Sequence, residues 1–168
     1  VETSARHVHL TAEHIEQLFG KGYKLNYKKE LSQPGQYACE ERVDITGPKG
    51  TIKGVIILGP ARAASQVEIS LSDARGLGIN APIRESGDVK ASGACTISNG
   101  ENKVELKEGV IAAKRHIHLT PEKAAEFSLT DKQICKVRIE GERALIFDEV
   151  VVRVNESFAP AMHIDTDE

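Results

Sequence analysis

The chain has 168 residues, of which 40% are hydrophobic and 28% are charged, and its formal net charge is −3 at pH 7. This composition is typical of a globular protein that can bury a core, and the lack of a lysine and arginine block argues against a nucleic-acid partner. No apolar run approaches the roughly 18 residues of a membrane-spanning helix, so we expect no membrane partner.

The first predicted element is an extended segment that carries two histidines, within the sequence SARHVHLT at residues 4–11. Residues i and i+2 of a strand lie on the same face. His7 and His9 are therefore expected to point one way, while Val8 points the other. Such a pair supplies half of the ligands of a metal site.

A short helix is predicted directly after this segment, over residues 12–19. Thr11 is a good N-cap residue, and Glu13 interacts favourably with the positive end of a helix. His14 has no counterpart elsewhere in the chain, and we expect it to be exposed to solvent.

Short runs rich in valine, isoleucine and threonine, broken by glycine, proline and aspartate, make up most of the remaining chain. Short runs of strand-forming residues separated by turn-forming residues are typical of a mainly β protein with short strands and brief helices. The predicted strands cover residues 42–46, 51–58, 66–70, 94–98, 103–106, 110–112, 136–140, 144–147 and 150–154.

Three widely separated cysteines fall in or near these strands, at Cys39, Cys95 and Cys135. Their number is odd and no pair has CxxC spacing, which argues against a zinc ribbon and against a disulfide framework. We expect reduced intracellular thiols.

Two loops carry candidate anion-binding residues. The sequence GPARAAS contains Arg62, six residues before Glu68, and a guanidinium can bind phosphate through two parallel hydrogen bonds. The polar turn PIRESGD contains Ser86 and Gly87, which could donate further hydrogen bonds to an anion.

The histidine segment occurs a second time, as AKRHIHLT at residues 113–120. His116 and His118 again share one strand face. Thr120, followed by a proline suited to the first helical position, predicts a second capped helix over residues 121–127. The chain therefore contains two histidine strands that each run into a helix.

The repeat extends beyond the histidine pairs. The segments QVEISLSD and AMHIDTDE share an apolar residue, then Glu or His, then Ile, then hydroxyl and acidic residues. In this alignment Glu68 and His163 occupy equivalent places. We predict two β-modules related by internal duplication.

Imidazole nitrogens and carboxylate oxygens are common zinc ligands, and a catalytic zinc site has three protein ligands and one open position. The candidate ligands form two triads: His7, His9 and Glu68 in one, and His116, His118 and His163 in the other. A cupin-like HxHxxxE site is an alternative, but Glu13 and Glu122 each follow a helix cap that already explains them.

Taken together these motifs resemble the PduL-type phosphate propanoyltransferase family, phosphotransacylases associated with bacterial microcompartments and propanediol degradation. The resemblance covers essentially the whole chain, because SARHVHLT, GPARAASQVEIS, PIRESGD, AKRHIHLT and MHIDTDE fall in family order. It implies two small β-barrels capped by short α-helices, one from residues 6–113 and one from residues 1–5 plus 114–168. One departure is Ser65, where the family motif has threonine.

The resemblance also implies an activity and a site. The reaction is the conversion of a short-chain acyl-CoA, either propanoyl-CoA or acetyl-CoA, and phosphate into acyl phosphate and CoA. Two zinc ions per chain would be bound by the two triads, with Arg62 as the catalytic, phosphate-binding arginine. Ser86, from the polar turn, is our own candidate for a second phosphate-binding residue. A dinuclear zinc hydrolase of thioesters or phosphoesters is an alternative, as is a zinc-stabilised binding module or shell adaptor.

Assembly is expected on general grounds, and location from the resemblance. Homo-oligomers are common among soluble proteins, and we expect one here, with a dimer favoured. The protein would lie in the bacterial cytoplasm, either free or inside a microcompartment in contact with its shell.

Overall fold

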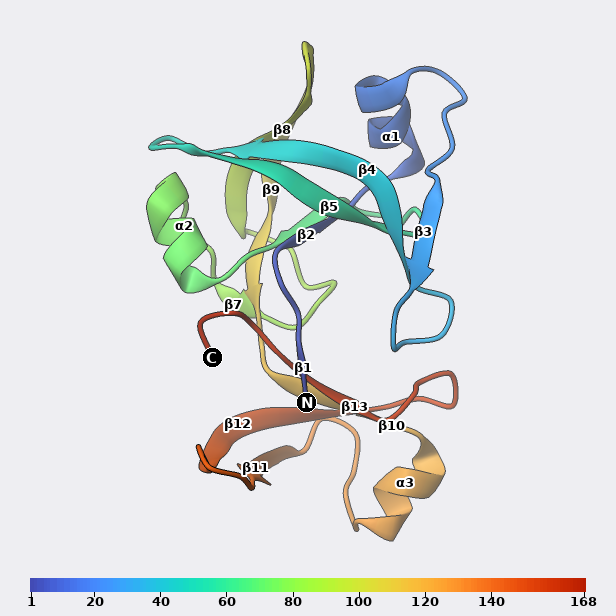
Figure 1. Cartoon of the computed structure of the whole chain (residues 1–168), viewed down its shortest axis with the longest axis vertical. Coiled ribbons are helices and arrows are strands. Elements are labelled where there is room, and N and C mark those ends of the chain that lie inside the picture. The colour runs from blue at the N-terminus through green and yellow to red at the C-terminus, as the bar shows by residue number, and fades with distance from the viewer.

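The protein has two lobes, which the computed structural model describes over residues 1–168 (Figure 1). One lobe is a closed six-stranded β-barrel, and the other is a separate five-stranded sheet. Three short helices lie around them. The prediction of a mainly β fold with short helices is confirmed. Of the two predicted barrels, the first is closed, whereas the second unit is a five-stranded sheet.

The barrel contains six strands: β2 (His7–His9), β4 (Tyr37–Thr46), β5 (Thr51–Gly59), β6 (Gln66–Glu68), β8 (Gly93–Asn99) and β9 (Asn102–Ala113). They run in the order β4-β5-β2-β6-β9, and β8 closes the circle by pairing with both β9 and β4. Two further strands extend its edges: β3 (Tyr27–Glu30) beside β4 and β7 (Ile83–Arg84) beside β9.

A single cluster of 20 buried hydrophobic residues fills the barrel. The side chains of a strand alternate between its two faces, and along β4 Val43 and Ile45 are buried while Arg42 is exposed. In β2 the fully buried Val8 belongs to this core. His7 and His9, one residue to either side, therefore project from the outer face of the barrel.

The second lobe contains five strands: β1 (Glu2–Thr3), β10 (His116–Leu119), β11 (Ile134–Ile139), β12 (Leu145–Val154) and β13 (Ala161–Ile164). Their order is β1-β13-β10-β12-β11, and the edge strands β1 and β11 do not pair with each other. Its core is small and consists of two clusters of three buried residues each: Leu119, Ala124 and Val152, and Phe147, Val150 and Met162.

The chain crosses between the lobes at two places that matter for the site. Residues 4–6 connect β1 in the second lobe to β2 in the barrel, and residues 114–115 connect β9 in the barrel to β10 in the second lobe. Each histidine strand begins directly after one of these crossings. Both histidine pairs therefore lie at the junction of the lobes. The division into one domain of residues 6–113 and a second of residues 1–5 plus 114–168 stays a prediction.

Each helix begins after a hydroxyl N-cap whose oxygen accepts the N–H of the third residue that follows. The helices are α1 (Ala12–Phe19), α2 (Leu71–Leu77) and α3 (Pro121–Glu126). The sequence analysis did not predict α2, although Ser70 followed by Asp73 has the spacing of a capping box and Ser70 does cap the helix. No helix has both the length and the apolar character needed to span a lipid bilayer.

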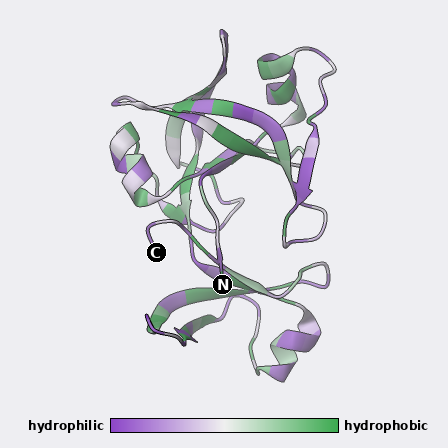
Figure 2. Ribbon diagram, in the orientation of Figure 1, coloured by the Kyte–Doolittle hydropathy of each residue, from purple (hydrophilic) through white to green (hydrophobic).

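Several strand boundaries differ from the predicted ones. The two runs at 103–106 and 110–112 form one strand, β9, which continues through Gly109 at a φ of 138°. The runs at 144–147 and 150–154 also form one strand, β12. Strand β3 was not predicted because its sequence, Tyr-Lys-Lys-Glu, is hydrophilic (Figure 2), and all four residues are exposed. Cys39, Cys95 and Cys135 are free thiols in strands, as predicted.

Candidate metal centre

The first triad is assembled by strand register. Strand β2 runs antiparallel to β6 with His7 directly opposite Glu68, and directly opposed residues have neighbouring side chains on one face. His9, two residues along, joins the same face. The ligand atoms of His7, His9 and Glu68 lie within 4.8 Å of one another, and all three residues are buried.

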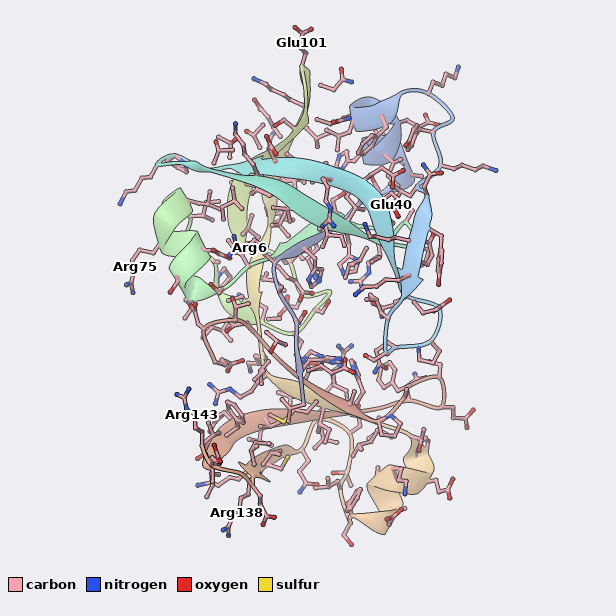
Figure 3. All side chains as sticks on the ribbon, viewed as in Figure 1. Arg6, Glu40, Arg75, Glu101, Arg138 and Arg143 are labelled. Carbon is pink, nitrogen blue, oxygen red and sulfur yellow. The ribbon has the colours of Figure 1, made fainter.

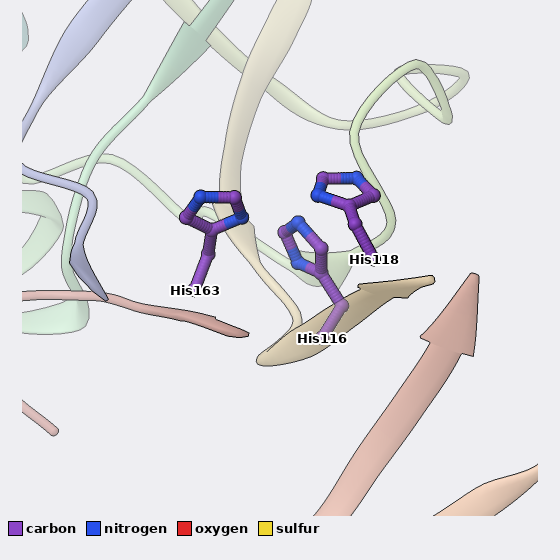
Figure 4. A group of neighbouring side chains, drawn as sticks. All are labelled: His116, His118 and His163. Atoms are coloured by element: carbon purple, nitrogen blue, oxygen red, sulfur yellow. The ribbon is translucent and has the colours of Figure 1, made fainter. Parts of the chain in front are cut away.

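The second lobe repeats this arrangement. Strand β10 runs antiparallel to β13 with His116 opposite His163, and His118 completes the group, whose ligand atoms also lie within 4.8 Å. Figure 4 shows the three rings gathered around one space, and the ring centroid of His163 lies 5.2 Å from that of His116 and 5.1 Å from that of His118.

The strands on either side of each histidine strand also have the same arrangement in both lobes. Strand β2 is parallel to β5, and β10 is parallel to β12, so each histidine strand lies between one parallel and one antiparallel neighbour. The predicted equivalence of Glu68 and His163 therefore has a counterpart in the strand register. An origin by internal duplication stays a prediction.

His9 and His118 are held in the neutral form that metal binding requires. Burial, reinforced by the charge of a neighbouring histidine, lowers the pKa of each to about 3. The Nδ1 atoms of both are buried without a hydrogen-bond partner. Because buried polar atoms are nearly always satisfied, this pair of orphaned nitrogens is the observation that fits a bound metal at each triad.

His7 and Glu68 form a buried pair, with 3.4 Å between Nε2 and Oε2. Burial opposes a charge on His7, but the Glu68 carboxylate and the Ala5 carbonyl outweigh it and raise the His7 pKa. Burial likewise opposes a charge on Glu68, but His7 holds the pKa of this carboxyl well below its usual range. The buried Glu68 carboxylate therefore favours a positive charge next to it, which a bound cation would supply.

The first histidine of each pair has a fixed orientation. Nδ1 of His7 donates to the carbonyl of Ala5 at 2.9 Å, and Nδ1 of His116 donates to the carbonyl of Lys114 at 2.8 Å. A hydrogen bond at one ring nitrogen determines the tautomer and leaves the other nitrogen as a ligand. In both triads Nε2 is thus available.

Arg62 lies in a loop that is held against the start of α1. Its N–H donates to the carbonyl of Leu10 at 2.9 Å, and the hydroxyl oxygen of Ser65 accepts the N–H of Thr11 at 3.0 Å. Ser65 Oγ also lies 2.7 Å from Nδ1 of His14. The prediction that His14 is solvent-exposed is wrong, because this contact holds its ring partly buried against the Arg62 loop.

Gln66 connects the candidate ligand Glu68 to the polar turn. It is 2% exposed, and its Nε2 donates to Glu68 Oε1 at 2.5 Å and to Ser86 Oγ at 3.0 Å. Its Oε1 accepts the N–H of Gly87 at 2.7 Å, so that N–H is already used. The sequence analysis missed Gln66, although its place two residues before Glu68 puts it on the same strand face.

One cavity of about 460 Å³ at the junction of the lobes is lined by all six candidate ligands and by Arg62 and Ser86. Nη1 of Arg62 donates to Ser86 Oγ at 3.3 Å. Two residues that the sequence analysis did not single out also line it. Arg153 comes from β12, and the ring of Phe158 lies 4.3 Å from that of His118.

The loop that carries Phe158 is tied to the barrel lobe. The side-chain amide of the buried Gln33 donates to the carbonyl of Ala159 at 2.9 Å and accepts its N–H at 3.3 Å. This double contact holds an aromatic wall next to the second triad, at the edge of the cavity.

Comparisons of this chain with a family profile and with known proteins all indicate the same family. A sequence profile described as phosphate propanoyltransferase matches residues 1–168. A phosphate propanoyltransferase of Clostridioides difficile (strain 630) is 55% identical over all of this chain and 80% of the relative. Those of Enterococcus faecalis (strain ATCC 700802 / V583) and Listeria monocytogenes serovar 1/2a (strain ATCC BAA-679 / EGD-e) are 54% and 52% identical over all of this chain, and over 80% and 79% of their own lengths. The chain therefore belongs to the phosphate propanoyltransferase family of acyltransferase enzymes.

Proposed function

We propose that the protein interconverts a short-chain acyl-CoA and phosphate with acyl phosphate and CoA, with propanoyl-CoA or acetyl-CoA as the thioester. The observation that supports this most directly is the convergence of two metal-ligand triads and Arg62 on one cavity. Relatives named phosphate propanoyltransferase at 50–55% identity support the same assignment.

We further propose that each triad binds one zinc ion. The donors are those that zinc accepts: two imidazoles and a carboxylate from His7, His9 and Glu68, and three imidazoles from His116, His118 and His163. Three protein ligands leave a coordination position open. When bound, zinc would act as a Lewis acid toward the thioester carbonyl and as a soft partner for the departing thiolate.

The chain's own residues would bind and orient phosphate. The Arg62 guanidinium provides positive charge and paired N–H donors, and it is held next to Ser86 at the cavity wall. An oxygen of phosphate then forms a bond to the thioester carbon as the carbon–sulfur bond breaks, and the proton of the phosphate ends on the CoA thiol. Orientation and charge stabilisation carry the rate enhancement.

Direct attack by phosphate is favoured because the chain offers no reactive thiol in the cavity. Burial raises the pKa of Cys39 to about 11 and that of Cys95 to about 12. A thiol with such a pKa is a poor nucleophile at neutral pH. None of the three cysteines lines the cavity.

The test is thiol release from propanoyl-CoA and acetyl-CoA by the zinc-loaded protein, with and without phosphate. Release should require phosphate and should match the acyl phosphate formed, which hydroxylamine traps as a hydroxamate. Thiol release at the same rate without phosphate would show the alternative instead, a dinuclear zinc hydrolase. No release under either condition would contradict both enzymatic assignments.

A homo-oligomer, with a dimer favoured, is proposed because homo-oligomers are common among soluble proteins and because of one surface feature. Strands β11 and β12 expose Ile134, Leu145 and Ile146, which are 48%, 43% and 62% accessible. Exposed apolar side chains on one sheet favour association. Light scattering in solution would show a single-chain mass if this is wrong. The proposed microcompartment location and shell contact depend on the family resemblance alone.

Gln66 is expected to position both the metal ligand and the phosphate-binding turn. In a Gln66→Leu variant Glu68 and Ser86 lose a shared hydrogen-bond donor and the Gly87 N–H loses its acceptor, so kcat/KM should fall about 10- to 100-fold, as is typical for residues that orient metal ligands. The measurement is steady-state kinetics with zinc content. Gln17→Leu, on the exposed face of α1, is the matched control and should be unaffected. An active Gln66→Leu enzyme would contradict this role.

A further inference from the structure

We propose that inorganic phosphate and acyl phosphate pass to and from the metal cavity through a second opening, separate from the space that the acyl-CoA occupies. This opening is the basic cleft, defined by Arg84, Ser86, Lys114, Lys132 and Arg153. The inference depends on the proposed function and adds to it a route and a binding surface for the smaller substrate.

The basic cleft is formed only where the two lobes meet. Residues 83–88, which include β7 and the polar turn after it, come from the barrel lobe, and Lys114 lies in the crossing segment. Lys132 and Arg153 come from the second lobe. The cleft encloses about 660 Å³, and Ile83 is the one hydrophobic residue in its wall.

Two residues connect the cleft to the metal cavity, because Ser86 and Arg153 line both. Ser86 Oγ accepts from Nη1 of Arg62 at 3.3 Å. Arg62 and Arg153 both line the metal cavity, so an anion that passes Ser86 meets both guanidinium groups.

The cleft has an excess of positive charge. Arg84 pairs with Asp88 at 3.0 Å, and Lys132 pairs with Glu85. Lys114 and Arg153 have no carboxylate partner; the Arg153 guanidinium instead lies over the Phe158 ring, 5.7 Å from its centroid. Four cations and two carboxylates leave a local charge of +2 on a chain whose net charge is −3. A cleft of this kind attracts dianions and raises their association rate.

The walls of the two spaces favour different substrates. The metal cavity includes apolar residues such as Ile56, Leu58 and Phe158, which suit the pantetheine arm and the acyl chain of a thioester. The basic cleft has almost no apolar wall and suits a small hydrated anion. Separate routes allow phosphate to bind, and acyl phosphate to leave, while CoA still fills the metal cavity.

The test compares charge reversals in the cleft with equal reversals elsewhere. Lys114→Glu/Lys132→Glu changes the cleft by four charge units, and Lys53→Glu/Lys103→Glu makes the same change at exposed barrel positions outside it. For the cleft variant we expect the KM for phosphate to rise about tenfold at low salt, and the KM for acyl phosphate to rise in the reverse reaction. The KM for acyl-CoA, the kcat at saturating phosphate and the zinc content should stay within about twofold of wild type.

Salt and direct binding provide independent readouts. The difference between the cleft variant and the control variant should shrink as ionic strength rises, because exposed charges are screened. Calorimetric titration of the zinc-loaded protein with inorganic phosphate should show the same weakening without any turnover. The wild-type protein could bind phosphate in the cleft and yet transfer no acyl group. That result would refute the proposed function and still support the cleft as an anion site.

CoA also carries phosphate groups, and the experiment distinguishes binding of these groups in the cleft from binding of free phosphate. If the cleft bound the CoA phosphates, the variant would raise the KM for acyl-CoA, and this increase would be smaller with the 3′-dephospho thioester. That result would overturn the proposal. Equal KM values for phosphate in the cleft and control variants would overturn it as well.

Discussion

Replacing Arg62 with alanine is expected to lower the phosphate-dependent rate about 100- to 1,000-fold, the range found when a donor that stabilises developing charge is removed. Arg62 is the proposed phosphate ligand, held at the cavity wall through Leu10 and Ser86. Its side chain is not a metal ligand, so two zinc ions per chain should remain. The measurement is the initial rate at several phosphate concentrations, with metal content determined on the same sample.

The control for this variant is Arg143→Ala. Arg143 is exposed and projects outward from the second lobe (Figure 3), and it does not line the cavity. Its replacement should leave the rate unchanged. Arg62→Lys should recover only part of the activity, because a lysine ammonium keeps the charge but not the bidentate geometry. Full phosphate-dependent activity in Arg62→Ala would refute its role.

Replacing His118 with alanine is expected to remove one zinc ion per chain and to lower the rate at least about 100-fold. His118 is 6% exposed, its Nδ1 has no hydrogen-bond partner, and its ring faces His116 and His163. The variant leaves two ligands in the second triad and three in the first. Metal analysis after dialysis should therefore give about one ion per chain, where wild type gives about two.

The matched control is His14→Ala, which removes the one histidine outside the triads. It should keep both ions, whatever its effect on the Arg62 loop. Thermal unfolding supplies a second readout, because an ion that binds only the folded state raises the melting temperature. Chelation should therefore lower the melting temperature of wild type more than that of His118→Ala. A His118→Ala protein that kept two ions would show that His118 is not a ligand.

Local features of the chain predicted the parts of the site that lie within single segments. Helices α1 and α3 followed from Thr11 and Thr120, because capping depends on residues only three positions apart. The shared face of each histidine pair followed from the two-residue period of a strand. Glu68 and His163 were identified as third ligands because two related segments could be compared with each other.

The tertiary structure revealed the residues whose roles depend on distant partners. His14 is held by Ser65, which is 51 positions away, and no periodicity in α1 predicts that contact. Gln66 contacts Glu68 within its own strand, and it contacts Ser86 and Gly87 in the polar turn about 20 positions further along the chain. Arg153 and Phe158 line the cavity only because β12 and the loop after it lie against the barrel lobe. Each such contact requires a particular strand register and lobe arrangement.

The sequence by itself determined the mainly β character, the family resemblance, both sets of candidate ligands and the candidate arginine. Only the tertiary structure showed that one unit is a closed barrel and the other an open sheet, and that both triads line one cavity. The physical reason is that side-chain periodicity and capping act over a few residues. The pairing of His7 with Glu68 and of His116 with His163 depends on strand register and on where the chain crosses between the lobes.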